Sequence, residues 1–258
     1  MEWFYQFGRW VAERLGIADW FHAEVGYAAF GMSILLFVFF VFCGWLAIRK
    51  TRKTRAALSK FARKMDWSFK PKDNRLMAKG FFGLPLFQRG SWSGVRNVFS
   101  GKFEEAEFTL FEFWYKIKDM PSNHYLVTAF FLNGRQLPEF QLSHESVARK
   151  DCEKLDYKII DFESDPEFSK RYTLMTPNGE GGRELFPENI RFFFRNRPRD
   201  KTGSLTGKGN WLLFYQFTTG YMGRATEDYI RDIQGCLKSA FETYRAFLEQ
   251  RISQSTRY

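Results

Sequence analysis

The segment 25–48 is the strongest constraint on what this chain can fold into, because it contains no charged side chain. Its centre, residues 34–42, reads Ile-Leu-Leu-Phe-Val-Phe-Phe-Val-Phe. A helix of about 20 apolar residues matches the hydrocarbon thickness of a bilayer. A core helix of a globular domain would carry a polar stripe, and a signal peptide would have a shorter apolar run preceded by basic residues. We therefore predict a transmembrane helix at 25–48.

The charges on the two sides of this span differ. Segment 1–24 holds two basic and four acidic residues, whereas segment 49–64 holds eight basic residues and no acid. Because Lys and Arg accumulate on the cytoplasmic side of a span, the N-terminus is predicted outside and the C-terminal part inside. The basic residues nearest the span are expected to contact anionic lipid headgroups. They are Arg49, Lys50, Arg52, Lys53 and Arg55.

The composition excludes several classes of protein. Aromatic residues make up 19% of the chain, which is too many for a disordered protein. Three Cys residues do not support a disulfide scaffold in a chain of 258 residues. The net charge of +10 comes largely from the eight basic residues of 49–64, so nucleic acid is not needed to explain it and is not expected as a partner.

The N-terminal segment 1–24 has an amphipathic pattern of its own. Trp3, Phe7 and Trp10 repeat at helical spacing, and Val11 and Leu15 extend the same face. Trp side chains favour the headgroup level of a bilayer. We predict an extracytoplasmic amphipathic helix that lies on the membrane, with a packing face for another membrane protein as the alternative.

The rest of the chain is predicted to be a basic juxtamembrane connector at 49–79 and a cytoplasmic domain at 80–258. The basic helix continues over 54–65, and Pro71 favours extended chain at 67–71. Runs rich in Phe, Val, Tyr and Trp predict strands, and the short turns between them favour an antiparallel meander. These runs are 81–87, 95–103, 108–117 and 125–132. In 108–117 several apolar side chains occur in each of the two alternating sets, so both faces of this strand are expected to be largely covered.

Further strands are predicted at 140–142, 168–175 and 211–217, the last preceded by a Gly-rich hairpin loop at 203–210. A short helix is expected to begin near Pro187. A long helix is expected to begin at Thr226, because apolar residues then follow a 3.6-residue period as far as Ile252. The predicted fold is therefore α+β: a single N-terminal transmembrane helix, a mainly antiparallel sheet and a long C-terminal helix packed on the sheet.

Two stretches carry a resemblance. One is Gly-Leu-Pro-Leu-Phe at 83–87 followed by Val-Arg-Asn-Val at 95–98, and the other contains Asp-Pro-Glu-Phe at 165–168. Together they resemble bacterial membrane-tethered proteins assigned to domains of unknown function. The resemblance covers most of 80–220. It implies a bacterial inner-membrane location, and it implies no catalytic residue.

Neither a metal site nor a cofactor is expected. The three His and three Cys residues lack the paired spacing of a structural zinc site. A nucleophilic pair of Cys152 with His144 stays an alternative to a loop His beside an unrelated thiol. The Gly-rich run 203–209 precedes a predicted strand, whereas a phosphate-binding loop precedes a helix. The acidic run 161–167 is interpreted as solvated charges or as a docking partner for the basic connector.

One basic cluster lies far from the span and is interleaved with Phe192, Phe193 and Phe194. It comprises Arg191, Arg195, Arg197, Arg199 and Lys201. We weigh three interpretations of this cluster: a solvated loop beside buried Phe side chains, an anionic bilayer surface, and a phosphate or nucleic-acid site.

The sequence thus predicts a single-pass protein whose cytoplasmic domain is a membrane-tethered binding, adaptor or sensor module. A membrane-anchored enzyme with an unrecognised site is the first alternative, and a phosphate- or nucleic-acid-binding domain is the second. The expected partners are the lipid bilayer and either another membrane protein or a second copy of the chain. Convergent polar groups in a deep pocket would favour the enzyme, and an exposed apolar or charged patch would favour the binding module.

Overall fold

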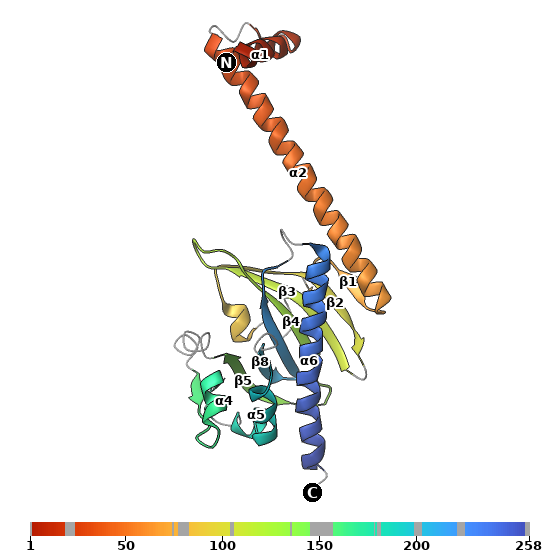
Figure 1. Cartoon of the computed structure of the whole chain (residues 1–258), viewed down its shortest axis with the longest axis vertical. Helices are drawn as coiled ribbons and strands as arrows, with labels where there is room; N and C mark the ends of the chain where they lie inside the picture. The colour runs from red at the N-terminus through yellow and green to blue at the C-terminus, as the bar shows by residue number, and fades with distance from the viewer. Residues whose placement is uncertain are drawn as a thin grey trace. The chain divides into compact units, whose positions relative to one another are not determined.

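The computed structural model shows an α+β protein (Figure 1). It divides into two compact units, residues 1–56 and 57–258. The residues described are 2–18, 24–73, 75–76, 83–103, 106–134, 136–144, 157–177, 179, 182–198, 203–220 and 225–255, with the side chains of 24–28 and 248–255 excepted.

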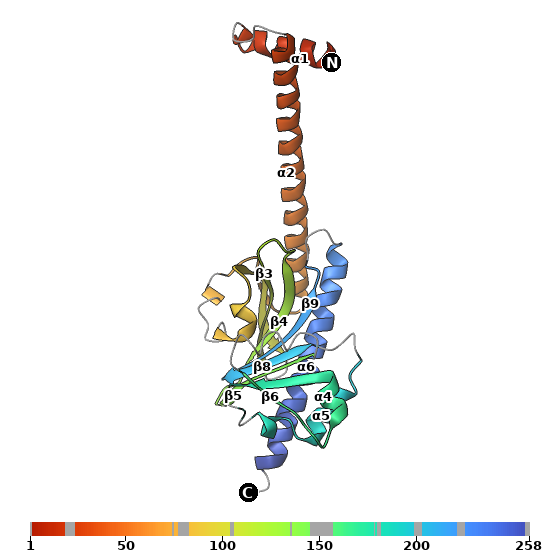
Figure 2. The same cartoon turned by 90° about the vertical axis from the view of Figure 1, so that its left-hand side faces the viewer.

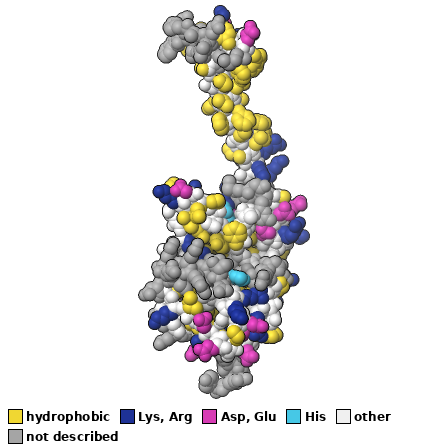
Figure 3. Space-filling view, turned by 60° about the vertical axis from the view of Figure 1, so that its left-hand side comes forward, with side chains coloured by type: hydrophobic (Ala, Val, Ile, Leu, Met, Phe, Trp, Pro, Cys, Tyr) yellow, Lys and Arg dark blue, Asp and Glu magenta, His cyan; other side chains and the backbone are white. Residues whose placement is uncertain are grey.

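The first unit contains helix α1 (Glu2–Arg14) and most of helix α2 (Glu24–Lys64). Among the described residues, the segment Ala29–Lys64 is the one helix long and apolar enough to cross a membrane; its most apolar window has a mean hydropathy of 2.4 and is 6% buried. Phe37 and Phe40 are 69% and 68% exposed. Apolar side chains cover this part of α2, and Lys and Arg side chains follow it directly (Figure 3). A single-pass membrane protein accounts for this pattern.

Helix α1 and helix α2 meet backbone to backbone. A Cβ atom added at Gly31 would lie 2.5 Å from the carbonyl oxygen of Phe4 and 3.0 Å from the nitrogen of Gly8. A larger residue at position 31 would therefore force the two helices apart. Trp3 and Trp10 stay 60% and 57% exposed on α1. The predicted N-terminal helix is confirmed, and its position on the membrane stays a prediction.

The second unit is built on an antiparallel sheet in which, over the described residues, nine strands follow the order β1-β2-β3-β4-β9-β8-β5-β7-β6. The meander predicted from the short turns is confirmed, since β2, β3 and β4 pair in sequence order. The strands are β1 (Ser68–Lys70), β2 (Trp92–Phe103), β3 (Ala106–Lys116), β4 (Asn123–Phe131), β5 (Leu137–His144), β6 (Lys158–Ile160), β7 (Tyr172–Thr176), β8 (Ser204–Gly209) and β9 (Trp211–Thr218).

Both faces of the central strand β3 are buried, as its two apolar sets predict. Phe108 and Leu110 belong to a large core on one face, and Phe111 and Phe113 belong to a smaller core on the other. The smaller core is closed by the 3₁₀ helix η4 (Pro85–Gln88), which buries Leu86 and Phe87. The sheet is therefore the middle layer of the unit.

Helix α6 (Thr226–Ser255) covers the face of the sheet that carries the large core (Figure 2). It contacts β4 and β9, so the predicted packing of the C-terminal helix on the strand at 211–217 is confirmed. Leu58 and Ala62, in the last turns of α2, are buried in the same core. The last turns of α2 are therefore part of this unit.

Three local predictions were wrong. The second half of the strand predicted at 81–87 is the helix η4, because Pro85 fixes φ and lacks an N–H group for a strand ladder, while 81–82 lie outside the described residues. The first half of the strand at 168–175 belongs to helix α4 (Pro166–Arg171), which begins where Asp165 accepts a hydrogen bond from the Phe168 N–H. The loop at 203–210 contains strand β8, and its turn lies at its end, between β8 and β9.

The packing of α6 gives a first testable prediction. The Phe241 ring lies 4.1 Å from Phe103, 5.1 Å from Phe130 and 5.4 Å from Phe108, centroid to centroid. Phe241→Ala should lower the free energy of unfolding by about 3–5 kcal/mol, because it removes a buried aromatic ring from this cluster. A thermal melt of the detergent-solubilised chain measures the loss. Phe192→Ala, at a position 57% exposed, is the control and should leave the melt unchanged. An unchanged melting temperature of Phe241→Ala would contradict the packing of this face of α6 on the sheet.

Candidate functional site

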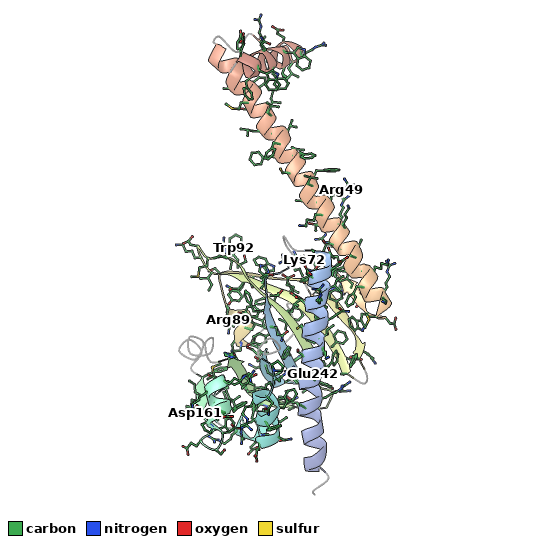
Figure 4. The ribbon with its side chains drawn as sticks, viewed as in Figure 1. Arg49, Lys72, Arg89, Trp92, Asp161 and Glu242 are labelled. Atoms are coloured by element: carbon green, nitrogen blue, oxygen red, sulfur yellow. The ribbon has the colours of Figure 1, made fainter. Side chains whose placement is uncertain are left out.

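The five basic residues predicted to contact lipid are exposed along α2. Arg49, Lys50, Arg52, Lys53 and Arg55 all lie on the helix surface. The Arg49 guanidinium stacks over the Trp45 ring at 5.2 Å, a position in which the charge stays near the indole and solvent (Figure 4). This segment keeps its positive charges available to an outside partner.

The second predicted cluster is engaged within the domain. Arg191 and Arg195 lie on helix α5 (Glu188–Arg195) and donate to the buried carboxylate of Asp165, at 3.3 Å and 2.9 Å. Asp165 is the residue that caps α4, so the ion pairs hold α4 against α5. The acidic run at 161–167 therefore supplies a partner for these two arginines.

Arg197 is buried, with 6% of its surface exposed. Its guanidinium donates to the Thr243 hydroxyl at 2.6 Å and to the Ser239 carbonyl at 2.9 Å, both on α6. It also lies over the Phe193 ring at 5.0 Å. In this structure Arg197 thus ties the end of α5 to α6. The remaining members of the predicted cluster, Arg199 and Lys201, lie outside the described residues.

The most connected polar site is one that the sequence analysis did not identify. Glu112, on β3, is completely buried. One carboxylate oxygen lies 2.6 Å from Arg96 Nη2 and 2.9 Å from His124 Nδ1. The other accepts a hydrogen bond from the Tyr229 hydroxyl at 2.7 Å and one from Asn97 Nδ2 at 3.3 Å. We call these five side chains, from β2, β3, β4 and α6, the Glu112 network.

A β-bulge brings two partners to Glu112 from one strand. The register between β2 and β3 shifts between Arg96 and Phe99, and Asn97 has a φ of +52°. The extra residue turns Arg96 and Asn97 toward the same carboxylate, which a regular alternation would prevent. The Asn97 N–H is satisfied outside the ladder by the Pro71 carbonyl, at 3.0 Å.

A glycine allows the network to close. Gly220 has a φ of +73°, and a Cβ atom there would lie 2.8 Å from a Glu112 carboxylate oxygen and 3.0 Å from His124 Nδ1. Any larger residue would therefore be strained and would press on the network. The signal in the sequence that could have indicated this site is Glu112, an acid in the middle of a mainly apolar strand. A carboxylate buried at such a position needs hydrogen-bond partners from other parts of the chain.

The network keeps Glu112 ionised. Burial alone would raise the pKa of Glu112, but the hydrogen bonds from His124 and Arg96 and the Arg96 charge outweigh burial and hold this pKa below its usual range. Burial and the Glu112 charge raise the pKa of Tyr229 well above its usual value. The Tyr229 hydroxyl therefore stays a donor, and the network joins the start of α6 to the bulge of β2.

A separate apolar groove of about 300 Å³ lies between α6, the end of β2 and the last turns of α2. Phe61, Trp67, Leu237 and Phe241 form its walls. Met65 and Phe103 at its edge are 42% and 36% exposed. Helix α6 supplies three charged side chains at the edge of the groove, Lys238, Glu242 and Arg245. Glu242 is labelled in Figure 4. The groove is at the small end of the range for ligand sites, and it includes no member of the Glu112 network.

The described residues include no group of three or more His, Cys, Asp or Glu side chains placed to hold a metal ion. Cys236 is buried, and burial raises the pKa of its thiol to about 12, so it stays protonated. Cys43 is exposed on the apolar part of α2. The alternative pair of Cys152 with His144 cannot be placed, because Cys152 lies outside the described residues.

The Glu112 network gives a second prediction, in two parts. Glu112→Ala should lower the free energy of unfolding by about 3 kcal/mol, because it leaves the Arg96 charge without its buried partner. The lowered pKa of Glu112 means that its stabilising effect is complete above the ordinary Glu pKa and is lost as the pH falls through the lowered value. Glu112→Gln should therefore be less stable than the native chain at neutral pH and should approach it in acid. Melts recorded from neutral to acidic pH test this, and a pH-independent difference would contradict it.

Comparisons with known proteins support the fold. No family model and no curated protein matches the chain. The chain is similar in structure to a solved protein, the mycobacterial trehalose monomycolate transport factor A, TtfA, with a TM-score of 0.50 and 12% sequence identity. The similarity covers 76% of this chain and 96% of that one. At this identity the comparison establishes a shared fold.

Proposed function

We propose that this chain is an inner-membrane protein whose cytoplasmic domain, held at the membrane by α2, is a binding or adaptor module. The observation that carries the proposal is the exposed apolar surface of α2. Phe37, Phe39 and Phe40 are each at least 59% exposed, and water would be an unfavourable surrounding for so many apolar side chains on one helix. A bilayer removes that cost.

The charges support the orientation. Five exposed basic residues begin at Arg49, directly after the apolar surface, whereas segment 1–24, on the other side of the span, holds four acidic and two basic residues. Basic residues this close to a span are retained on the cytoplasmic side and attract anionic lipid by about 1 kcal/mol each. The domain that follows them is then cytoplasmic.

Two observations support a binding role over catalysis. The groove beside Phe61 and Phe241 presents apolar side chains, which suit an apolar segment or ligand. The Glu112 network has the shifted pKa values of many active sites, yet its carboxylate is used to hold Arg96, Tyr229 and His124 within the fold. An enzyme that uses the network remains the alternative function.

The solved structure that shares the fold is named as a transport factor. We infer from this a role as an accessory factor of a membrane process, in which the domain binds another component of that process.

A reporter that is active only in the cytoplasm tests the orientation. Fused after Tyr258, it should be active, because the basic segment is retained inside. Replacing Arg49, Lys50, Arg52 and Lys53 by Gln should reduce the active fraction, whereas replacing Lys208 and Lys238, far from the span in sequence, should leave it unchanged. An inactive reporter on a well-expressed native chain would contradict the proposal.

Site-specific photo-crosslinking tests the binding role. A photoreactive amino acid at Met65, on the groove, should capture one discrete product in native membranes. The same group at Ile159, on β6, should not, although Ile159 is 46% exposed and Met65 42%. Equal capture at the two positions would argue against a binding site at this groove.

A further inference from the structure

One end of the sheet exposes a group of large apolar side chains. Trp92 begins β2, Ile117 and Met120 lie in the turn between β3 and β4, and Phe217 lies near the end of β9. Their exposed fractions are 73%, 44%, 58% and 64%. Figure 4 shows Trp92 at the extreme end of the strands. We call these four residues the sheet tip.

The strand register brings the four side chains to the same end. Trp92 pairs with Lys116, the residue before Ile117. On the other side of β3, Asn123 of β4 pairs with Tyr115. The ring of Phe217 lies 5.8 Å from that of Tyr125 on β4. Four neighbouring strands, β2, β3, β4 and β9, thus meet at the tip.

The turn at the tip is tight. The Met120 N–H donates to the Ile117 carbonyl at 3.0 Å, and Asp119 has a φ of +61°. This geometry holds the two apolar residues at either end of one short turn. The side chains of the turn are exposed from Lys116 to Ser122.

The charges around the tip are mainly basic. Lys116 and Lys118 flank Ile117, and Asp119 is the acid of the turn. Lys side chains can place their amines among phosphate headgroups while their methylene stems remain in an apolar layer. Trp is the residue that most favours the headgroup level. The tip therefore has the composition of a protein surface that enters the bilayer interface.

We propose that the sheet tip inserts into the headgroup layer of the membrane that α2 crosses. This inference rests on the proposed membrane tether. The chain has nine peptide units from Ile48 to Ala57, so it can separate the domain's point of attachment from the end of the span by about 30 Å at most. The point where the domain is attached is thus always close to a lipid surface, which offers an apolar partner for the four exposed side chains.

The sheet tip, and not the basic cluster at 191–199, is then the surface of the domain that contacts the membrane. Arg191, Arg195 and Arg197 are bound to groups inside the domain, whereas Lys116 and Lys118 lie exposed beside apolar residues. Phe192, in the basic cluster, is 57% exposed and Met120 is 58% exposed. The two positions are therefore matched probes for the two surfaces.

The test uses three full-length chains that each keep one cysteine: native Cys43, Met120→Cys or Phe192→Cys. Cys152 and Cys236 are replaced by Ser and Ala in all three, and Cys43 by Ser in the last two. Each chain carries a nitrobenzoxadiazole label and is reconstituted into vesicles of three parts phosphatidylethanolamine to one part phosphatidylglycerol. Emission is quenched by a lipid spin-labelled near the headgroup or by iodide equilibrated across the bilayer.

The label at Met120→Cys should be quenched by the spin-labelled lipid and protected from iodide, and the label at Phe192→Cys should show the reverse. Lowering the phosphatidylglycerol content should weaken lipid quenching at Met120→Cys, because Lys116 and Lys118 lose their anionic partners. Equal iodide quenching at Met120→Cys and Phe192→Cys would overturn the inference. Protection of Met120→Cys from both quenchers would also overturn it, since a protein or a second copy would then cover the tip.

The label at Cys43 separates this inference from the proposed function. If the label at Cys43 is protected from iodide and the label at Met120→Cys is not, α2 crosses the membrane but the sheet tip does not insert into it. If the label at Cys43 itself is quenched by iodide, α2 does not lie in the membrane, and both the proposed tether and the insertion of the sheet tip are contradicted. Met120 and Phe192 are both surface positions, so neither substitution threatens the fold.

Discussion

The apolar surface of α2 is the constraint on which the rest of the account depends. Along Ala29–Lys64 the most apolar part of the helix is almost entirely unburied, whereas Leu58 and Ala62, a few turns later, are covered completely by the core of the domain. A single helix thus changes its surroundings between Ile48 and Leu58. The exposed basic residues from Arg49 to Arg55 lie at that change, where a charged side chain is compatible with both lipid headgroups and water. The proposed position of the domain beside a membrane rests on this one helix.

Two buried carboxylates hold the polar connections of the domain. Asp165 caps α4 and pairs with Arg191 and Arg195 on α5, and Glu112 joins the bulge of β2 to the start of α6. In each case the carboxylate accepts several hydrogen bonds, which is the condition under which burying a charge is tolerated. The arginines that looked like surface charges in the sequence are therefore fixed partners within the fold, and the Glu112 network fixes the strands that end at the sheet tip.

The sequence predicted the parts of the fold that leave a pattern in consecutive residues. The span follows from an uninterrupted apolar run, the meander of β2 to β4 from aromatic-rich runs joined by short turns, and the helix from Thr226 from apolar residues at a 3.6-residue period. It failed where a helix cap or a contact between distant parts of the chain decides the structure. The aromatic run near Phe168 has the composition of a strand, but the Asp165 cap begins a helix there. The Glu112 network depends on a bulge at Asn97 and on Tyr229, which lies 117 residues after Glu112 in the chain. The periodicity of apolar residues carries no information on such contacts. The ion pairs of Arg191 and Arg195 with Asp165 could not be predicted for the same reason, because they too join distant parts of the chain.

Extraction of native membranes with alkaline carbonate tests the central claim, that lipid surrounds the apolar surface of α2, most directly. This treatment releases peripheral proteins and leaves proteins with a lipid-embedded span in the pellet. The account predicts that the chain stays in the pellet, and that a chain with Leu36, Phe40 and Cys43 replaced by Glu is released, because three charges cannot be kept in the hydrocarbon layer. Release of the native chain into the supernatant would contradict the account, since α2 would then have to be covered by protein.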